Sequence, residues 1–113
     1  MSKDDAYVLD MLRAARLARD FGAECAEQQF LDDVKTQSAV LHQLTMLGAA
    51  VRRVSQEFQD AHQDVPWQQI AGLRNRIVHE YDEVDIDRVW QVIQRDLPVL
   101  ITALERIARP EPS

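Results

Sequence analysis

The sequence is poor in the residues that would indicate a disulfide-bonded or β-rich protein. Its one cysteine, Cys25, cannot form a disulfide within the chain, fits a reducing compartment, and is expected to be inert. Three glycines and four prolines among 113 residues leave few places for the tight turns of β-hairpins. Because Val, Ile and Thr also show little alternation with polar residues, the sequence predicts an all-α fold.

The sequence also lacks a long apolar run and an excess of positive charge. No apolar run approaches the ~20 residues of a membrane-spanning helix, and the N-terminal MSKDDAYVLD has acids where a signal peptide needs positive charge. We therefore expect a soluble cytoplasmic protein with no membrane contact. The net charge of -6 argues against indiscriminate nucleic-acid binding, because long-range attraction of phosphates needs a basic field. Any contact with RNA must come from a local cluster of cations.

Apolar periodicity predicts two helices in the first half of the chain. Ser2 with Asp5 resembles a capping box, and the helix that follows should end near Gly22. Residues 27–58 then fit one long helix, since apolar residues recur at helical spacing and no proline interrupts them. The run Gly48-Ala49-Ala50 in its middle would let another helix approach closely, either within the bundle or from a second copy.

Two further helices are predicted in the second half. Asp64 can cap a helix over residues 66–79 or 66–80, with Pro66 at an early position where its missing N–H is no loss. The apolar pattern of residues 86–107 predicts a last helix, which Pro98 must kink or split.

Short connections between these helices predict an antiparallel bundle of four to five helices. The length of 113 residues indicates one domain, which we assign to residues 1–109. Residues 110–113 are expected to form a disordered tail.

The segment RNRIVHEY, residues 74–81, carries more polar groups than packing requires. Arg74 lies within the apolar arc of its helix, and a guanidinium is not left dry and unpaired. It must therefore meet an acid inside the bundle or face a cleft or a subunit interface. Asn75 and His79 are four residues apart on the flank beside it, where Asn75 could orient the imidazole. Tyr81 follows at the end of the helix.

Such a group of side chains suits phosphodiester chemistry without a metal. A histidine can take a proton from a 2′-hydroxyl or give one to a leaving oxygen, and an arginine can stabilise the charge developing on the phosphate. One histidine cannot easily do both. A symmetric dimer that met along this helix would bring two histidines and two arginines to one cleft. Tyr81 could hydrogen-bond the substrate or accept a modification.

The residues alone leave other interpretations open. His79 could simply favour the negative end of the helix dipole, while Arg74 pairs with a structural acid such as Asp82 or Glu83. A purely structural bundle would bury Tyr81 and leave it unmodified. No metal is expected, because the neighbouring acids are not accompanied by a pair of histidine or cysteine ligands.

The stretch WQQIAGLRNRIVHEYDEVDIDRVWQVIQRDLPVL, residues 67–100, resembles the helical HEPN domain of the HepT-type toxins. The pattern of Trp, Ile, Gly, Arg-Asn, His and Tyr followed by Val-Asp and Val-Trp carries the resemblance, which extends over nearly the whole chain. It implies a HEPN-like bundle that works as a homodimer. It also implies a metal-independent ribonuclease with no cofactor, whose R-x-x-x-x-H-x-Y motif lies at the subunit interface.

Carried over residue by residue, the resemblance makes Arg74 and His79 the catalytic pair. Asn75 would be a positioning residue, and Arg76 would add a cation that helps to hold the substrate. Tyr81 would be the tyrosine that a partner antitoxin, an MntA-like minimal nucleotidyltransferase using ATP, adenylylates to silence the toxin. The substrate would be RNA, with tRNA as one candidate.

One position departs from the family pattern. Many relatives carry Gly-Glu-Ala where this chain has Gly48-Ala49-Ala50, so Ala49 replaces an acid that could have paired with Arg74. The alternative from another functional class is a HEPN-like binding or regulatory subunit that docks a nucleotidyltransferase and cleaves nothing. Retention of the whole motif favours the ribonuclease, since a scaffold has no chemical use for it.

Overall fold

The computed structural model describes residues 2–23 and 25–108, and this part of the chain contains helices and no strand. The prediction of an all-α fold is confirmed. In chain order the elements are α1 (Lys3–Ala23), α2 (Glu27–Asp32), α3 (Val34–Val51), α4 (Gln56–Ala61), α5 (Trp67–His79), the 3₁₀ turn η1 (Tyr81–Glu83), α6 (Ile86–Gln91), the π-helical segment η2 (Val92–Asp96) and α7 (Leu97–Ala108).

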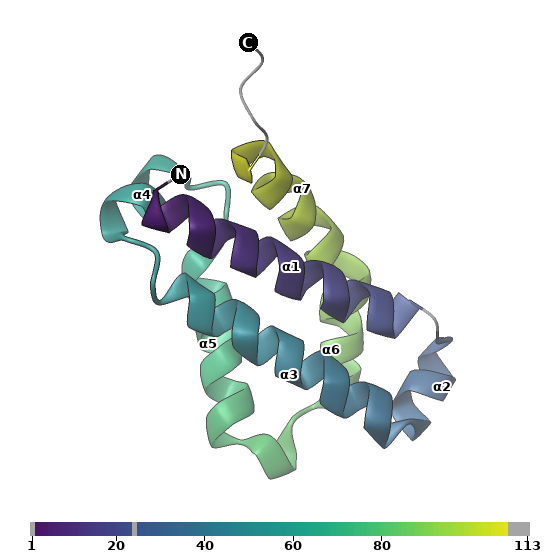
Figure 1. Cartoon of the computed structure of the whole chain (residues 1–113). Helices are drawn as coiled ribbons and strands as arrows, with labels where there is room; N and C mark the ends of the chain where they lie inside the picture. The colour runs from purple at the N-terminus through teal and green to yellow at the C-terminus, as the bar shows by residue number, and fades with distance from the viewer. Residues whose placement is uncertain (1, 24, 109–113) are drawn as a thin grey trace.

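The helices form a bundle of two layers. In Figure 1, α1 and α3 run side by side in opposite directions, and α5 and the rod formed by α6, η2 and α7 cross behind them. Helix α1 packs on α3 and α7, whereas α5 packs on α3. The short helices α2 and α4 close the two ends of the front layer. Four rods with short connections match the antiparallel bundle of four to five helices that the sequence predicts.

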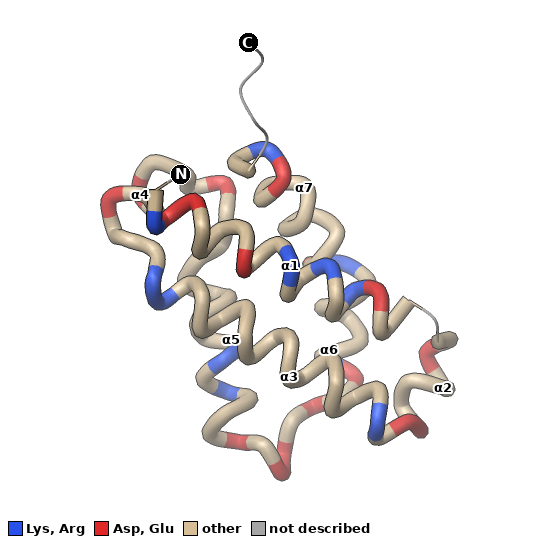
Figure 2. Tube along the Cα trace, viewed as in Figure 1, with Lys and Arg blue, Asp and Glu red and all other residues tan. Residues whose placement is uncertain are grey.

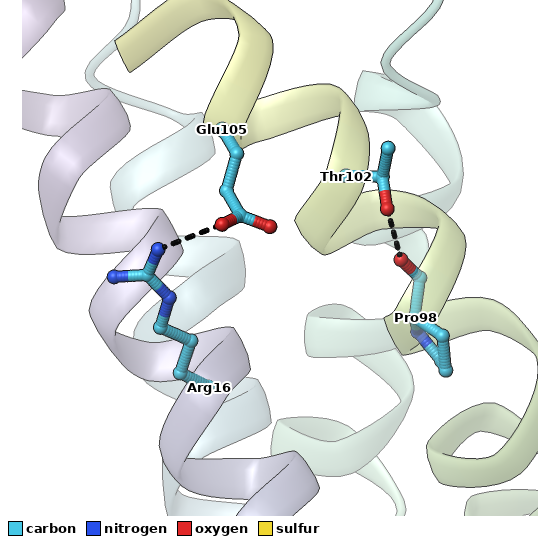
Figure 3. A network of polar contacts seen from close by, with 4 residues as sticks. All are labelled: Arg16, Pro98, Thr102 and Glu105. Atoms are coloured by element: carbon cyan, nitrogen blue, oxygen red, sulfur yellow. Dashed lines mark hydrogen bonds and ion pairs between the residues drawn. The ribbon is translucent and has the colours of Figure 1, made fainter. Parts of the chain in front are cut away.

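The core lies between the layers and contains apolar side chains from every rod. Its largest fully buried side chains include Phe30, Met11 and Leu44, and Phe30 lies on Trp90 with ring centroids 5.3 Å apart. Burying one large apolar side chain contributes roughly 1.5–3 kcal/mol, so this core is a major favourable contribution to folding. At the surface, Arg16 of α1 pairs with Glu105 of α7 at 3.1 Å (Figure 3).

The single long helix predicted for residues 27–58 is wrong, because polar side chains divide that stretch into three helices. Asp33 ends α2 and caps α3, accepting hydrogen bonds from the Thr36 N–H at 3.1 Å and the Thr36 hydroxyl at 2.6 Å. Ser55 caps α4 by accepting from the Phe58 N–H, and it donates its own N–H and hydroxyl to Asp4. These caps give the backbone an alternative to continuing the helix. The capping box of Ser2 with Asp5 at the start of α1 is confirmed.

The start of α5 also differs from the prediction. Pro66 is the N-cap residue, and the first helical residue is Trp67; no side-chain cap is present, so Asp64 does not cap the helix. The loop is fastened instead by Trp67, whose indole N–H donates to the His62 carbonyl at 2.9 Å and whose backbone N–H donates to the Val65 carbonyl. The end of α5 at His79 agrees with the sequence prediction.

Pro98 splits the last helix, as its missing N–H requires. The turn before it widens to the π-helical segment η2, in which the Leu97 N–H donates to the Val92 carbonyl five residues back. A widened turn separates the proline ring from the preceding carbonyls. Helix α7 then resumes, and the Thr102 hydroxyl donates to the Pro98 carbonyl at 3.1 Å (Figure 3).

Two remaining expectations concern the ends of the chain and the membrane. The predicted tail, residues 110–113, lies outside the described residues. Within the described ranges, no helix is both long enough and apolar enough to span a bilayer.

Candidate active site

Helix α5 carries four of the five predicted site residues, and its geometry follows from its buried stripe. Ile70 and Ile77 face the core, which directs the residues between and beyond them to the edge of the helix or into solvent. The helix ends where the Glu80 N–H donates to the Arg76 carbonyl at 2.8 Å. Arg76 and His79 lie in this last turn, where cations interact favourably with the helix dipole.

Arg74 lies where α5 presses on α3, directly over Gly48. A Cβ atom added to Gly48 would overlap the Cβ of Arg74 and would lie 2.7 Å from its Cγ. Only glycine therefore allows the two helices to approach this closely. The close approach anticipated for Gly48-Ala49-Ala50 is confirmed as a crossing within the bundle, and its partner is the predicted catalytic arginine.

The guanidinium of Arg74 has little to bind within one chain. Its Nη1 donates to the Asn75 side-chain oxygen at 3.3 Å, and its Nε is buried without an acceptor. Across residues 2–23 and 25–108, the ion pairs are Arg16–Glu105 and Arg19–Asp20, so the suggested pairing of Arg74 with Asp82 or Glu83 is not found. A buried donor without an acceptor costs about 1–3 kcal/mol. Arg74 thus has unused hydrogen-bonding capacity.

Asn75 binds Arg74 and does not orient the imidazole of His79. No hydrogen bond joins Asn75 to His79 among the described side chains, and both residues are exposed. Arg74 and Val78, like Asn75 and His79, are four residues apart and therefore adjacent on the helix surface. We call these four residues the α5 strip. It contains an arginine, an amide and an imidazole beside Val78, which is 44% exposed.

Tyr81 follows the strip in the 3₁₀ turn η1 and is 60% exposed. The interpretation as a purely structural bundle predicted a buried Tyr81, and that prediction is therefore wrong. The turn after α5 is acidic, with Glu80, Asp82, Glu83 and Asp85 around Tyr81 (Figure 2). The phenol is accessible, and its surroundings would repel a polyanion.

Arg76 faces away from Arg74 and lines a groove on the other flank of α5. The same groove receives Arg88 of α6 and Arg95 of η2, which the sequence reasoning did not connect with the site. No local spacing could have shown this, because the three arginines lie on different elements, which face one groove only in the folded chain. Among the described residues, no group of three or more His, Cys, Asp or Glu side chains could hold a metal ion.

Comparison with known proteins identifies relatives over most of the chain. Residues 11–107 match the family model described as ribonuclease HepT-like. A probable ribonuclease HepT from Thermococcus cleftensis is 31% identical over 103 residues, covering 91% of this chain and 94% of that protein. A putative RNase from Methanocaldococcus jannaschii is 31% identical over 111 residues, covering 96% and 92%. One from Caldanaerobacter subterraneus is 32% identical over 84 residues, covering 74% and 75%.

No solved structure matches the chain with significance. The family match spans all of α3, α5 and α6, and therefore both the seat of Arg74 and the α5 strip. The chain belongs to the HepT-like ribonuclease family.

Proposed function

We propose that this chain is the endoribonuclease toxin of a toxin–antitoxin pair, with Arg74 and His79 as catalytic residues. The observation that carries the proposal is the state of Arg74, which is seated on Gly48 with a buried Nε that lacks an acceptor. A phosphate cannot reach the buried Nε, but it would supply acceptors to the Nη groups beside it. His79 lies in the next turn of the same helix, where its exposed imidazole can reach the same substrate.

The proposed reaction needs no metal. One imidazole removes the proton of a ribose 2′-hydroxyl, and the oxygen attacks the adjacent phosphorus as the bond to the 5′-oxygen breaks. A second imidazole donates a proton to the leaving 5′-oxygen. The products are a 2′,3′-cyclic phosphate and a 5′-hydroxyl end. Arg74 stabilises the negative charge that develops on the phosphate oxygens.

This reaction needs two imidazoles at one phosphate, and each chain offers one in the α5 strip. A symmetric homodimer that paired the two strips would supply the second His79 and a second Arg74. The half-exposed Val78 supports this arrangement, because an apolar side chain between polar site residues is suited to an interface core. In this dimer Asn75 holds the Arg74 guanidinium, and Arg76 binds a phosphate beside the cleaved bond.

We further propose that a minimal nucleotidyltransferase of the MntA type silences the toxin by transferring AMP from ATP to Tyr81. The 60% exposure of Tyr81 at the end of a short turn supports this role. The added phosphate would place negative charge beside His79 and repel RNA. A Tyr81→Phe variant should retain cleavage and should gain no AMP when incubated with the nucleotidyltransferase and ATP, as read by intact-mass spectrometry.

The ribonuclease assignment is tested by cleavage of a small-RNA pool that includes tRNA, in the presence of EDTA. The unmodified wild type should cut, and the Arg74→Ala and His79→Ala variants should lose about 100-fold or more of the rate. Folding of each variant is checked by circular dichroism and its oligomeric state by light scattering. Arg13→Gln removes an exposed cation from α1 and should cut like the wild type.

The composite site is tested with mixed dimers. A dimer of one wild-type and one His79→Ala chain, purified through two different tags, should be nearly inactive if one phosphate needs both imidazoles. Half of the wild-type activity would show that each chain works alone. If the unmodified wild type cuts none of the RNAs, the binding or regulatory subunit becomes the better function for this chain, and Arg74 and His79 become docking residues.

A further inference from the structure

A groove of about 780 Å³ lies between α5 and the rod of α6, η2 and α7. It exists because α5 packs on α3 while its backbone barely approaches the rod. Leu44 and Leu47 of α3 form the floor between the two walls. Arg76, on the α5 wall, is three residues from His79 and adjacent to it on the helix surface. The groove therefore begins beside the α5 strip.

Three arginines from both walls reach this groove, namely Arg76, Arg88 and Arg95, which we call the groove arginines. All three are exposed, and none takes part in the ion pairs found among the described residues. Two acids also line the groove: Asp64 lies before α5, at the end away from His79, and Asp96 follows Arg95. The lining thus carries three arginines against two acids, in a chain whose net charge is -6.

The floor of the groove offers little to an apolar partner. Leu44, Leu47 and Leu97 are each 1% exposed, so their apolar surface is already used in the core. No aromatic residue lines the groove in the part of the chain that the structure describes, which excludes base stacking as the main attraction. The exposed side chains that line the groove include Val99, which is 71% exposed, and the three arginines, whose guanidinium groups bind phosphate oxygens with paired hydrogen bonds.

We propose that the groove arginines bind backbone phosphates of single-stranded RNA next to the bond cleaved at His79. This inference rests on the proposed ribonuclease function and adds to it two contact residues, Arg88 and Arg95, that lie outside the R-x-x-x-x-H-x-Y motif. A single strand leaving the α5 strip crosses Arg76 and enters the groove, where Arg88 and Arg95 hold it from the opposite wall. Contacts to phosphates carry no base identity, so the groove sets affinity and the path of the strand, not sequence preference.

Binding is measured separately from cleavage. In a His79→Ala background, which leaves the probe intact, a labelled single-stranded RNA of mixed sequence is titrated by fluorescence anisotropy over a series of KCl concentrations. Adding Arg88→Gln with Arg95→Gln should raise the Kd about tenfold at low salt and reduce the slope of log K against log salt by about 1.4. Arg13→Gln with Arg106→Gln removes the same charge from exposed positions outside the groove and should change the Kd less than about twofold.

Cleavage kinetics then distinguish a failure of the groove from a failure of the enzyme. In the active protein, Arg88→Gln with Arg95→Gln should raise KM while kcat stays within about twofold. The reason is that the groove binds the substrate and the transition state equally, so its loss weakens binding without slowing the chemical step. If the wild type cleaves RNA but this variant keeps its KM and its salt slope, the groove proposal is wrong and the ribonuclease assignment stands. If the wild type cleaves nothing, the anisotropy titration still decides whether the groove binds RNA.

A protein ligand is the other outcome to recognise. If the groove variant binds RNA like the wild type but no longer binds an adenylylating nucleotidyltransferase, the groove is a protein-docking site and the RNA proposal is overturned. Circular dichroism melts of every variant test whether a change in binding comes from unfolding. We expect every variant to stay folded, because the substituted side chains are exposed.

Discussion

The contact of Arg74 with Gly48 couples the proposed catalytic arginine to the packing of two helices. In a Gly48→Ala variant the new Cβ would overlap Arg74, so α5 must move away from α3. Such overpacking costs about 1–3 kcal/mol in the free energy of unfolding, which denaturant titration measures. Because the guanidinium moves with the helix, kcat for RNA cleavage should fall about tenfold or more, with a smaller change in KM.

Two matched variants show whether this loss comes from the position of Arg74. Ile101→Val in α7 removes a buried methyl group at a cost of about 0.5–1.5 kcal/mol and should leave kcat unchanged. Gly72→Ala places a methyl group where nothing lies within 4 Å and should stabilise α5 by about 0.5–1 kcal/mol. If Gly48→Ala keeps its kcat despite lost stability, cleavage does not depend on the position of Arg74 against Gly48.

At the residue scale, the sequence predicted the site residues that lie on or next to α5, but it did not predict the contact of Arg74 with Gly48 of α3. Arg74, Asn75, His79 and Tyr81 form a contiguous motif, so spacing and family resemblance could name them. The run Gly48-Ala49-Ala50 indicated that a helix could cross α3 there, but no local pattern showed that the partner would be Arg74 of α5. The hydrogen bond between Arg74 and Asn75 was missed for a related reason, since helical spacing placed Asn75 nearest to His79.

At the scale of elements, apolar periodicity predicted the rods of the bundle but could not show where the chain between them breaks. The spacing of Phe30, Leu41, Leu44 and Val51 continues through Asp33, and these four side chains are buried, whereas Val34 of the same pattern is 72% exposed. The break follows from a cap, whose hydrogen bonds compete locally with the helix. Pro98 behaved as predicted because its effect is covalent and needs no partner.

The cap at Asp33 predicts a dependence of stability on pH. The hydroxyl of Thr36, and then its backbone N–H, lower the pKa of Asp33 below the ordinary value of about 3.9. A lowered folded-state pKa means that the carboxylate stabilises the fold above its unfolded-state pKa, and that this contribution disappears as the pH falls through the folded-state pKa. In an Asp33→Asn variant the amide can still cap but cannot titrate. The wild type should therefore lose stability relative to this variant below about pH 4.

Urea titrations of both proteins from neutral pH down to about pH 2.5 would measure this difference. Asp10→Asn, at an exposed position in the middle of α1, serves as the control for general loss of negative charge. A difference between wild type and Asp33→Asn that stays constant over the whole range would show that the cap carries no titrating contribution.

At the scale of the whole molecule, opposite charges gather on either side of the α5 strip. The groove arginines lie on one flank of α5, and the acidic turn around Tyr81 follows its end. Under the proposal, an RNA strand would be drawn in from the groove and repelled at the turn. The proposed arrangement would reconcile a net charge of -6 with a ribonuclease, and it would leave Tyr81 away from the groove, where an enzyme that modifies it could approach.

The proposed active site requires a dimer, because one chain supplies only one His79 and one Arg74. Val78 would lie near the two-fold axis, so a Val78→Asp variant would set two carboxylates against each other in a desolvated interface. The variant should be monomeric by light scattering and should lose about 100-fold or more of its cleavage rate. Its thermal melt as a monomer should remain cooperative, because Val78 is 44% exposed and lies outside the core.

Val34→Asp makes the same change at the start of α3, where the side chain is 72% exposed, and it should remain dimeric and active. Comparing Val78→Asp with Val34→Asp tests separately where the dimer interface lies and whether one active site needs two chains. A monomeric Val78→Asp variant that still cuts RNA would show that one chain holds a complete site, and the unused capacity of Arg74 would then need an acceptor from the substrate alone. A variant that stays dimeric would place the interface on another face. If each active site is built from two chains, the Val78→Asp variant should lose dimerisation and RNA cleavage together. High protein concentration should restore both by mass action.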